Sequence, residues 1–529
     1  MISLVIMYNS IKVLMFYNFR ILKWWIGKRG NRVLVSEKLS YLAKETPSSI
    51  ITSFQGRETS YKDLFEQAKR LAGYFQSKGY EQEDIIAVYL INSDYFLTCY
   101  YACQLGGFTI LPINTKLTAR EVNYIFTHSE AKALIYDTRL QFILDELSET
   151  MNSFEHVLYL GEENTLLEVF NDESLKFNEV KVDENTTTVI FYTSGTTGKP
   201  KGVMLSAANV RATAKLYEEA LELNSADRMQ IVAPLFHCAA SHVFSIPIIY
   251  AGGTVVIEEG FSPEQTMETL EHEKITIFFG VPAMYSILLN SSKMETLDLS
   301  NLRLFTYGAA PMPFELIRKI KAMFPEVKVQ NIYGQTENSP AATTLKDHYA
   351  LEKVGSVGEP VPGTQVRVVG ERGKPIPIGQ VGEIVVKGPQ LMKGYLKNEE
   401  ATRQAIRDGW LYTGDLGRMD EDGLLYIVDR KKDMIIRGGE NVFPVEVEEV
   451  LYEIPEILEA AVVGIPHEVY GEVPKAYVVL KEGKELKEED ILGKCSKSLA
   501  KYKLPVEVEF IDSLPRNASG KVLKTTLRN

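Results

Sequence analysis

Cysteine is scarce in this sequence, and the four cysteines that it contains show no ligand or disulfide spacing. A structural zinc site would need Cys-x-x-Cys or Cys/His clusters, and a secreted disulfide scaffold would need more cysteines at closer spacing. Cys99 and Cys103 lie four residues apart, which places them on one face of a helix and predicts core packing. This usage fits a protein of the reducing cytoplasm.

Positive charge and long apolar runs are also scarce. Lys and Arg number 58 against 70 Asp and Glu, a formal net charge of −12, which argues against a general affinity for nucleic acid. No apolar run reaches the ~18 residues that a membrane-spanning helix needs. The chain instead has 45% apolar and 24% charged residues over 529 positions, which is typical of a globular protein of several structural units.

The N-terminal extension, residues 1–35, is apolar and basic but is interrupted by polar residues, and no small-residue cleavage site follows it. One interpretation is an amphipathic surface anchor with paired tryptophans at the headgroup level. The other is upstream sequence read as protein, because codons for the Lys-Arg-Gly triplet at 28–30 can spell a ribosome-binding site before Val33 or Val35. We favour the second interpretation, since a globular pattern begins only at Ser36.

Helix-like segments alternate with short apolar runs through most of the chain, which predicts a doubly wound α/β body with ligands at the carboxyl ends of its strands. The helix-like segments are 62–79, 95–105, 119–127 and 314–324. The apolar runs are 85–90, 133–136, 229–233, 254–257, 276–279, 304–307 and 327–332.

The pattern changes twice toward the C-terminus. Residues 354–395 hold short strands, such as 365–369 and 383–387, separated by Gly and Pro, which predicts a small antiparallel barrel or sheet on the body. After Lys432 the apolar runs 460–465, 476–480 and 506–511 surround a helix-like segment at 488–502, which predicts a separate small α+β unit. We therefore expect an extension at 1–35, a large domain at 36–431 and a small, mobile domain at 432–529.

The stretch FYTSGTTGKPKGVMLS (191–206) follows an apolar run and combines glycines, hydroxyls and lysines. A hairpin turn is the simplest explanation, but a turn needs only two to five such residues. Exposed N–H groups, hydroxyls and lysines are suited to a polyphosphate. The stretch is not a Walker A loop, because Gly195 and Gly198 are three apart and Pro200 follows Lys199.

Five segments in order carry a family resemblance over residues 36–529. They are YTSGTTGKPKG (192–202), YGQTENSP (333–340), YTGDLG (412–417), DRKKDMIIRGGENVFP (429–444) and PRNASGK (515–521). Together they resemble the acyl-adenylate-forming superfamily, which includes acyl-CoA synthetases, peptide-synthetase adenylation domains and beetle luciferases. One such segment would be a modest indication, whereas five in order are highly specific.

The resemblance implies a two-step reaction with ATP, Mg²⁺ and CoA. The carboxylate attacks the α-phosphate of ATP, pyrophosphate leaves and acyl-AMP forms; a thiol then displaces AMP. An anion must approach a polyanion in the first step, so the site has to supply positive charge. The glycine-rich loop would wrap the β- and γ-phosphates, with Lys201 and the Thr hydroxyls donating to phosphate oxygens.

By the same resemblance, Tyr333 would stack on adenine, Thr336 would touch the α-phosphate and Glu337 would hold Mg²⁺, with Thr193 as a less secure second ligand. Asp415 and Arg430 would grip the ribose hydroxyls. A solvated loop charge is the alternative for Glu337, and a turn-capping Asp is the alternative for Asp415. The remaining nucleotide and cofactor contacts implied are Ser194, Gly195, Thr196, Thr197, Gly198, Gly308, Ala309, Ala310, Asn331, Gly334 and Ile427.

The last two segments imply a rotation of the small domain between the two steps. Lys521 would reach the carboxylate and α-phosphate during adenylation only, and Lys432 occupies the hinge position. Gly438 and Gly439 would then line the path of the CoA thiol, where a side chain would obstruct. Taken without the motif, Lys521 is one surface lysine among many.

The acyl substrate is harder to predict. His237 occupies a position where the family has an aromatic residue or His near the carboxylate, although a satisfied core histidine is an equal alternative. Candidate lining residues, each of which could instead be core, are Phe236, Val281, Pro282 and Tyr285. Relatives restricted to acetate carry Trp where this chain has Gly334, which predicts an open pocket floor. Resemblance to bacterial fatty acyl-CoA ligases makes a medium- or long-chain fatty acid our first choice.

Other activities share these motifs. An aryl- or o-succinylbenzoyl-CoA ligase, a free-standing adenylation enzyme for another acceptor, a peptide-synthetase adenylation domain and a non-catalytic nucleotide-binding scaffold are the alternatives. The intact loop, Glu337 and Lys521 argue against the scaffold. We expect small-molecule partners (a carboxylic acid, ATP and CoA) and no nucleic acid; a homodimer and peripheral contact with the inner face of the membrane are left open.

Overall fold

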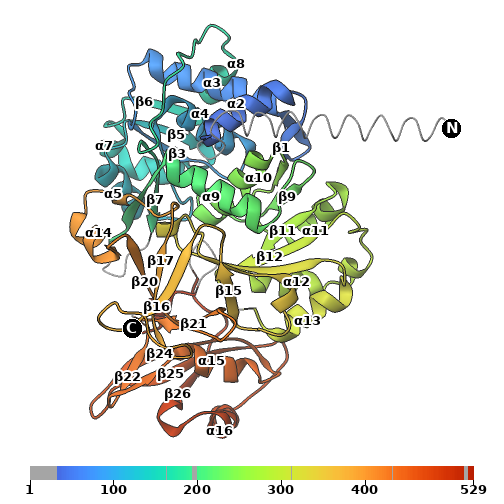
Figure 1. Cartoon of the computed structure of the whole chain (residues 1–529), viewed down its shortest axis with the longest axis vertical. Coiled ribbons are helices and arrows are strands. Elements are labelled where there is room, and N and C mark those ends of the chain that lie inside the picture. Colours follow the sequence, from blue (N-terminus) through green and yellow to red (C-terminus); the bar gives the residue numbers. More distant parts are fainter. Residues whose placement is uncertain are drawn as a thin grey trace, which may run out of the picture.

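The computed structural model of the chain describes residues 33–161, 164–193, 199–310, 312–431, 433–516 and 522–528 (Figure 1). The described strands form a seven-stranded, a fourteen-stranded and a five-stranded sheet. The predicted α/β class is confirmed, with doubly wound sheets, an antiparallel region and a smaller α+β unit. Within the described ranges, no helix combines the length and the apolar character that crossing a membrane requires.

The first sheet has the strand order β18-β8-β7-β4-β3-β5-β6 and is parallel from β7 to β6. Its strands are β3 (Ile85–Tyr89), β4 (Thr109–Pro112), β5 (Ala133–Asp137), β6 (His156–Leu160), β7 (Thr187–Thr193), β8 (Lys201–Ser206) and β18 (Gly394–Tyr395). Along β3, Ile86 and Val88 contact one apolar core while Ala87 and Tyr89 contact another. Both faces of the sheet are therefore buried, as strand alternation requires when helices cover each face.

The second sheet continues from parallel into antiparallel strands, in the order β16-β17-β20-β21-β15-β14-β13-β12-β11-β9-β10-β1-β2 with β19 paired to β20. The strands of its doubly wound part are β1 (Ile50–Phe54), β2 (Arg57–Ser60), β9 (Arg228–Ile231), β10 (Thr254–Ile257), β11 (Ile277–Gly280), β12 (Leu304–Gly308) and β13 (Lys328–Tyr333). Those of its antiparallel part are β14 (Thr343–Leu345), β15 (Ser356–Pro360), β16 (Gln365–Val369), β17 (Gly382–Lys387), β19 (Ile406–Arg407), β20 (Trp410–Met419) and β21 (Leu425–Arg430).

The largest core lies between these two sheets and is filled from a shared layer of helices. This layer contains α2 (Val35–Glu45), α3 (Tyr61–Ser77), α4 (Asp94–Gly106), α8 (Thr165–Asn171), α9 (Ala207–Ala220), α10 (Ile246–Ala251) and the π-helical turn η3 (Ala239–Ser245). Cys99 and Cys103 are free and buried within it, as predicted.

Further helices cover the outer faces of the sheets. On the first sheet these are α5 (Ala119–Ser129), α6 (Gln141–Leu144) and α7 (Ser148–Met151), and on the second α11 (Pro263–His272), α12 (Pro282–Asn290) and α13 (Phe314–Met323). The short helix α14 (Glu399–Ala405) packs beside β18. The 3₁₀ turns are η1 (Thr138–Leu140), η2 (Asp145–Leu147), η4 (Ser292–Glu295), η5 (Thr336–Asn338), η6 (Asp347–Tyr349) and η7 (Lys501–Lys503).

The third sheet contains only strands that follow Arg430 and lies at the bottom of Figure 1. Its order is β23-β22-β25-β24, with β26 beside β25. The elements of this unit are β22 (Ile435–Arg437), β23 (Glu440–Val442), α15 (Pro444–Tyr452), β24 (Ile457–His467), β25 (Gly471–Leu480), α16 (Glu488–Ser498), β26 (Glu507–Phe510) and α17 (Lys524–Leu527). Position 432, the predicted hinge, lies outside the described residues.

Local patterns placed most elements but not their partners. The first strands, β1 and β2, form a hairpin, and β1 joins β10 of the second sheet in parallel rather than pairing with β3, the strand that follows the hairpin in sequence. The antiparallel region is an open sheet that runs into the second sheet through β14, whereas β18 leaves it to pair with β8. The helix predicted at 488–502 ends at Ser498, because the chain turns extended at Leu499.

Candidate active site

The glycine-rich stretch connects two antiparallel strands, β7 and β8, whose ends pair at Thr193 and Lys201. The connection therefore has hairpin topology, and its length exceeds what a simple turn needs, so the two explanations of the sequence are compatible. The intervening Ser194, Gly195, Thr196, Thr197 and Gly198 lie outside the described residues. Thr193 and Lys201 are both half-buried.

The carboxyl ends of β12 and β13 meet beside one another, since the two strands pair in parallel from Leu304 to Gly308. A Cβ at Gly308 would lie 2.5 Å from the carbonyl oxygen of Ile332, so only glycine permits this close approach. Ala309 has a φ of 67°, a left-handed conformation that alanine rarely adopts, and it is exposed together with Ala310. Strain of this kind is characteristic of ligand-binding loops.

Asn331 lies on β13 opposite Tyr307. Its side-chain oxygen Oδ1 is buried and has no hydrogen-bond partner within the described part of the chain. A buried amide oxygen without a donor is costly, so this position has an acceptor available for a ligand.

Tyr333 and Asp415 are brought into direct contact, 82 residues apart in sequence. The Tyr333 hydroxyl donates to Oδ2 of Asp415 at 2.6 Å, and the Gln335 side chain donates to the same oxygen at 2.7 Å. Arg430 lies opposite Asp415 in the β20–β21 ladder, with Nε 3.3 Å from Oδ1. Asp415 is thus a buried carboxylate in a fixed orientation. Burial of Tyr333, together with the nearby charge of Asp415, raises the pKa of Tyr333 well above its usual value, so the Tyr333 hydroxyl remains a donor.

Ile427 is half-buried on β21 and packs with the small core that includes Tyr333. It therefore lies near the residues predicted to hold the nucleotide. Its own contact with a nucleotide remains a prediction.

Thr336 and Glu337 follow Tyr333 on the turn η5. The Thr336 hydroxyl lies 3.1 Å from the Sγ of Cys238, a buried thiol next to His237 in sequence. Burial raises the pKa of Cys238 to about 12, so the thiol stays protonated at neutral pH. His237 is half-buried, and its Nδ1 accepts from the Ala239 backbone N–H at 3.3 Å, so a neutral His237 carries its proton on Nε2.

Glu337 is held by one segment at two points. The Met392 backbone N–H donates to its carbonyl oxygen at 2.9 Å, and the Tyr395 hydroxyl donates to its Oε1 at 2.8 Å. The ring of Tyr395 also lies 5.0 Å below the Nζ of Lys201. The loop lysine and the turn carboxylate are thereby connected through one aromatic side chain.

The donor set at Glu337 fits magnesium rather than a metal held by protein ligands alone. Among the described residues, no group of three or more His, Cys, Asp or Glu could hold a metal ion. One carboxylate, whose Oε1 is oriented by Tyr395, matches the way Mg²⁺ shares its coordination sphere with phosphates and waters.

The candidate lining residues of the acyl pocket differ from one another in burial. Tyr285 is fully buried and its hydroxyl donates to the backbone oxygen of Thr306 at 2.8 Å, so it is a core residue and not an open pocket wall. Phe236 is buried, while Val281 and Pro282 are half-buried at the carboxyl end of β11. The interpretation of Gly334 as an open floor stays a prediction; a Cβ there would lie 1.8 Å from the carbonyl oxygen of Pro340, so close approach of the backbone is a second reason for glycine at this position.

Gly438 and Gly439 form the turn between β22 and β23, with φ values of 61° and 93°. Both are exposed, and a Cβ on Gly439 would meet no heavy atom within 4 Å. The structure thus does not bring this turn to the residues around Asp415. Lys521, like Lys432, lies outside the described residues.

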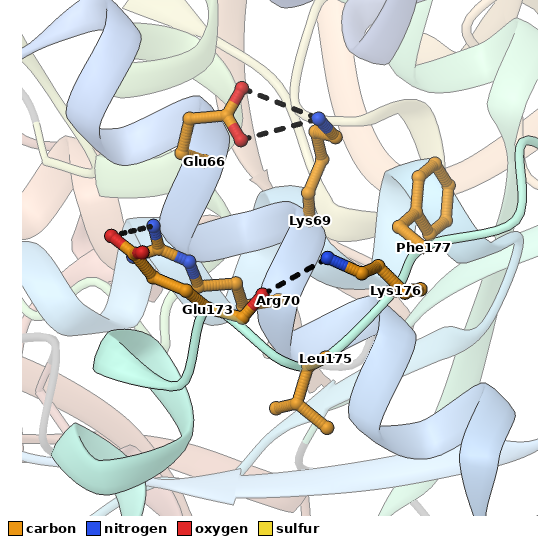
Figure 2. Close-up of a pocket in the computed structure, with 7 residues that line it drawn as sticks. All are labelled: Glu66, Lys69, Arg70, Glu173, Leu175, Lys176 and Phe177. Carbon is orange, nitrogen blue, oxygen red and sulfur yellow. Dashed lines mark hydrogen bonds and ion pairs between the residues drawn. The ribbon is translucent and has the colours of Figure 1, made fainter.

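A separate pocket is formed by α3 and the segment after α8, and Figure 2 shows its lining. Most of its charges are paired with one another: Lys69 contacts Glu66 at 3.2 Å, and Arg70 contacts Glu173 at 3.7 Å. None of the residues predicted for the site lines this pocket.

Three contacting residues escaped the sequence analysis: Gln335, Cys238 and Tyr395. Gln335 stands inside a recognised motif, so its spacing from Tyr333 was a usable signal. Cys238 and Tyr395 reach their partners from 98 and 58 residues away, and only the pairing of strands and turns reveals them.

Comparisons with known proteins identify the family of this chain. Residues 39–396 match the family model of the AMP-binding enzymes, and residues 446–521 match that of the AMP-binding enzyme C-terminal domain. A feruloyl-CoA synthase of Amycolatopsis is 35% identical over 92% of this chain and 96% of its own length. A long-chain-fatty-acid–CoA ligase of Mycobacterium tuberculosis is 35% identical over 89% of this chain and 92% of its own.

Among solved structures, the o-succinylbenzoate coenzyme A synthetase of Bacillus subtilis, in complex with ATP and magnesium ion, is 31% identical with a TM-score of 0.82. The match covers 93% of this chain and 98% of that one. The match to the family model extends over most of the chain, and the ligases that resemble it are covered nearly end to end. The chain therefore belongs to the AMP-binding enzyme family and is an acid–thiol ligase, an AMP-forming acyl-CoA synthetase.

Proposed function

We propose that this ligase activates an uncharged, apolar carboxylic acid, with a medium- or long-chain fatty acid as first choice. The observation that carries the proposal is the absence of charge from two segments, one that begins at His237 and one that runs from β11 into α12. Residues 237–251 and 278–289 contain no Asp, Glu, Lys or Arg. Burial also lowers the pKa of His242 to about 3, so this histidine supplies no cation.

An acid with a second carboxylate, such as o-succinylbenzoate, would bury an unpaired charge against these segments. Such burial costs several kcal/mol unless a cation compensates it. The same apolar character suits an alkyl chain and an uncharged aromatic ring alike. The feruloyl-CoA synthase and the fatty-acid ligase are both 35% identical to the chain, so an aryl acid is the competing substrate.

The nucleotide would bind where β12, β13, β20 and β21 meet. We assign adenine to Tyr333, Asn331, Ile427 and the 308–310 loop, on the grounds that Asn331 has a buried acceptor without a donor. Asp415 and Arg430 would bind the ribose, since Gln335 and Tyr333 already orient the carboxylate. A carboxylate accepting two hydroxyl bonds is a common device for ribose recognition.

In the first step the acid's carboxylate oxygen attacks the α-phosphorus, and the bond from that phosphorus to the pyrophosphate oxygen breaks. Thr336 would donate its hydroxyl to the α-phosphate, with the Cys238 thiol beside it. Lys201 and the loop at 194–198 would hold the β- and γ-phosphates, while Lys521 would stabilise the charge that develops between the reactants. Glu337, with Thr193 second, would hold Mg²⁺, which neutralises phosphate charge when bound.

In the second step the thiol of CoA attacks the acyl carbon, loses its proton and releases AMP. Gly438 and Gly439 would line the approach of the thiol after the small domain, residues 432–529, turns at Lys432. Their exposed position supports this assignment, because the space in front of Gly439 is open and can receive a ligand.

A panel of acids tests the substrate. We expect AMP release to be fastest with straight-chain acids of medium or long length, slower with feruloyl-type acids, and negligible with o-succinylbenzoate. Fastest release with an aryl acid would replace the alkyl substrate by the aryl one. Fast release with a dicarboxylic acid would refute the argument from the uncharged segments.

A further inference from the structure

Tyr395 makes two contacts that the established activity does not explain. Its hydroxyl donates to Glu337 Oε1 at 2.8 Å, and its ring face lies 5.0 Å from Lys201 Nζ. Within the described chain, Lys201 and Glu337 form no ion pair with each other.

The strand that carries Tyr395 is held by hydrogen bonds to β8 on one side and to Thr402 on the other. Tyr395 pairs with Val203 in the β18–β8 ladder, and period-2 alternation puts Lys201 on the same face as Val203, within diagonal reach of the ring. Its backbone N–H donates to the Thr402 hydroxyl at 2.9 Å. The Leu396 N–H donates to the Gly202 oxygen at 2.7 Å.

The same segment holds the backbone of Glu337, through the Met392 N–H at 2.9 Å. The carboxylate is therefore fixed at its backbone and at Oε1, and Oε2 carries no hydrogen bond or ion pair from the described residues. A carboxylate restrained in this way can offer one oxygen in a fixed direction. Partners that restrain a metal ligand in this manner are worth about 10- to 100-fold in metal affinity.

We propose that Tyr395 is a positioning residue for Mg²⁺-ATP binding: its hydroxyl orients the metal-binding carboxylate of Glu337, and its ring holds the phosphate-binding Lys201. The proposal rests on the proposed function of Glu337. The two contacts are separable, because Tyr395→Phe removes the hydroxyl and keeps the ring, whereas Tyr395→Leu removes both.

The experiment is equilibrium binding of ATP by calorimetry, without any carboxylic acid, once with Mg²⁺ and once with EDTA. Tyr395→Phe should weaken binding about tenfold with Mg²⁺ and by less than twofold with EDTA. Tyr395→Leu should weaken binding in both conditions, because Lys201 also loses its support. Tyr136→Phe is the matched control, since it removes a 2.6 Å hydrogen bond from another buried tyrosine to Gln141 and should change neither value.

The outcomes are distinguishable. An equal loss with Mg²⁺ and with EDTA in Tyr395→Phe, or no loss at all, overturns the role of the hydroxyl. Unchanged EDTA binding in Tyr395→Leu overturns the role of the ring. A wild-type protein that binds ATP equally with Mg²⁺ and EDTA contradicts the metal role of Glu337 itself, and that failure of the proposed function is visible before any variant is made.

Discussion

The surroundings of Asp415 and the turn at Gly438 and Gly439 differ sharply in burial and in the number of side chains that contact them. Asp415 is 4% exposed and accepts hydrogen bonds from two side chains, Tyr333 at the end of β13 and Gln335 just after it. Gly439 is exposed, and the space where its side chain would stand is empty to 4 Å. The nucleotide region is therefore preorganised, whereas the turn lacks the second surface that a binding path needs.

The side chains around the turn point to the same difference. Ile436 lies on β22, and Val469 and Tyr470 lie in the turn between β24 and β25, where the Tyr470 carbonyl oxygen accepts from the Gly438 N–H at 2.8 Å; the three side chains are 51%, 77% and 46% exposed. Apolar side chains gathered at such exposure are typical of a surface that contacts something else. Under the proposed function, the ribose-binding residues for the first half-reaction already lie together, and the second half-reaction would follow a movement of the small domain.

The largest effect is expected from Lys521→Ala, which tests the adenylation half-reaction. The sequence predicts that this lysine meets the developing charge during adenylation only. Loss of one such donor lowers the rate about 10²- to 10³-fold, so acyl-AMP formation, measured by pyrophosphate release, should fall by that factor. Thioester formation from preformed acyl-AMP and CoA should stay near the wild-type rate.

Lys524→Ala is the control for this variant, because Lys524 forms a 2.7 Å ion pair with Glu448 within the small domain. It should affect the two half-reactions equally. If Lys521→Ala also slows both half-reactions by the same factor, the lysine is structural and the rotation of the small domain has to be abandoned.

Gly439→Leu should produce the opposite pattern. A leucine at this exposed turn would project into the proposed thiol path, and misplacement of a reacting group by about 1 Å costs roughly 10- to 100-fold. Thioester formation should fall by that factor, while pyrophosphate release stays unchanged.

Left-handed backbone strain has to be separated from this obstruction, because leucine at a φ of 93° costs about 1–2 kcal/mol wherever it stands. Gly483→Leu supplies the comparison: Gly483 is exposed in the same domain, has a φ of 70° and has no heavy atom within 4 Å of a Cβ. A loss of thioester formation in Gly483→Leu equal to that in Gly439→Leu would mean that strain, and not the thiol path, causes the effect.

The preorganised region was the more predictable of the two regions because its residues stand in contiguous motifs. The sequence placed Asp415 and Arg430 as a pair, and the structure brings them together across the β20–β21 ladder. Local patterns also placed β10 and β16 at the predicted residues, since alternation and flanking Gly or Pro are encoded nearby.

What the sequence did not reveal depends on contacts between distant segments. Tyr395 meets Glu337 only because β18 leaves its neighbours to pair with β8. Whether a side chain at position 334 would meet the backbone depends on where the chain places Pro340, and motif comparison carries no such information. Tertiary pairing, rather than propensity, decides these cases.

Gly334→Ala tests whether that glycine serves the backbone or the acyl pocket. Its Cβ would fall 1.8 Å from the Pro340 oxygen, so the segment from Tyr333 to Glu337 would have to shift. Overpacking of this kind costs about 1–3 kcal/mol, and kcat/KM should fall by the same factor for every acid tested. A loss confined to long acids would support the pocket-floor interpretation. Gly260→Ala, at an exposed glycine with open space around it, should be silent.

The smallest effect is expected from a substitution of Asp429, whose side chain connects β21 of the large domain to α15 of the small unit. It is 4% exposed near the end of β21, and its Oδ2 accepts from the Val445 N–H of α15 at 3.2 Å. Burial raises the pKa of Asp429 to about 6, in spite of nearby Lys524. The folded state therefore holds this proton more tightly than the unfolded state does.

The sign of the pH dependence follows from that difference. The stability that Asp429 contributes is full below its unfolded pKa of about 3.9 and is lost as pH rises through about 6. Asp429→Asn stays neutral at every pH, so the variant should gain on the wild type by about 1–2 kcal/mol between pH 4.5 and pH 7. The difference in melting temperature between the two proteins at each pH measures this gain. A difference that does not change with pH would show that the carboxylate titrates as it does in water, and the contact between β21 and α15 would then be indifferent to its charge.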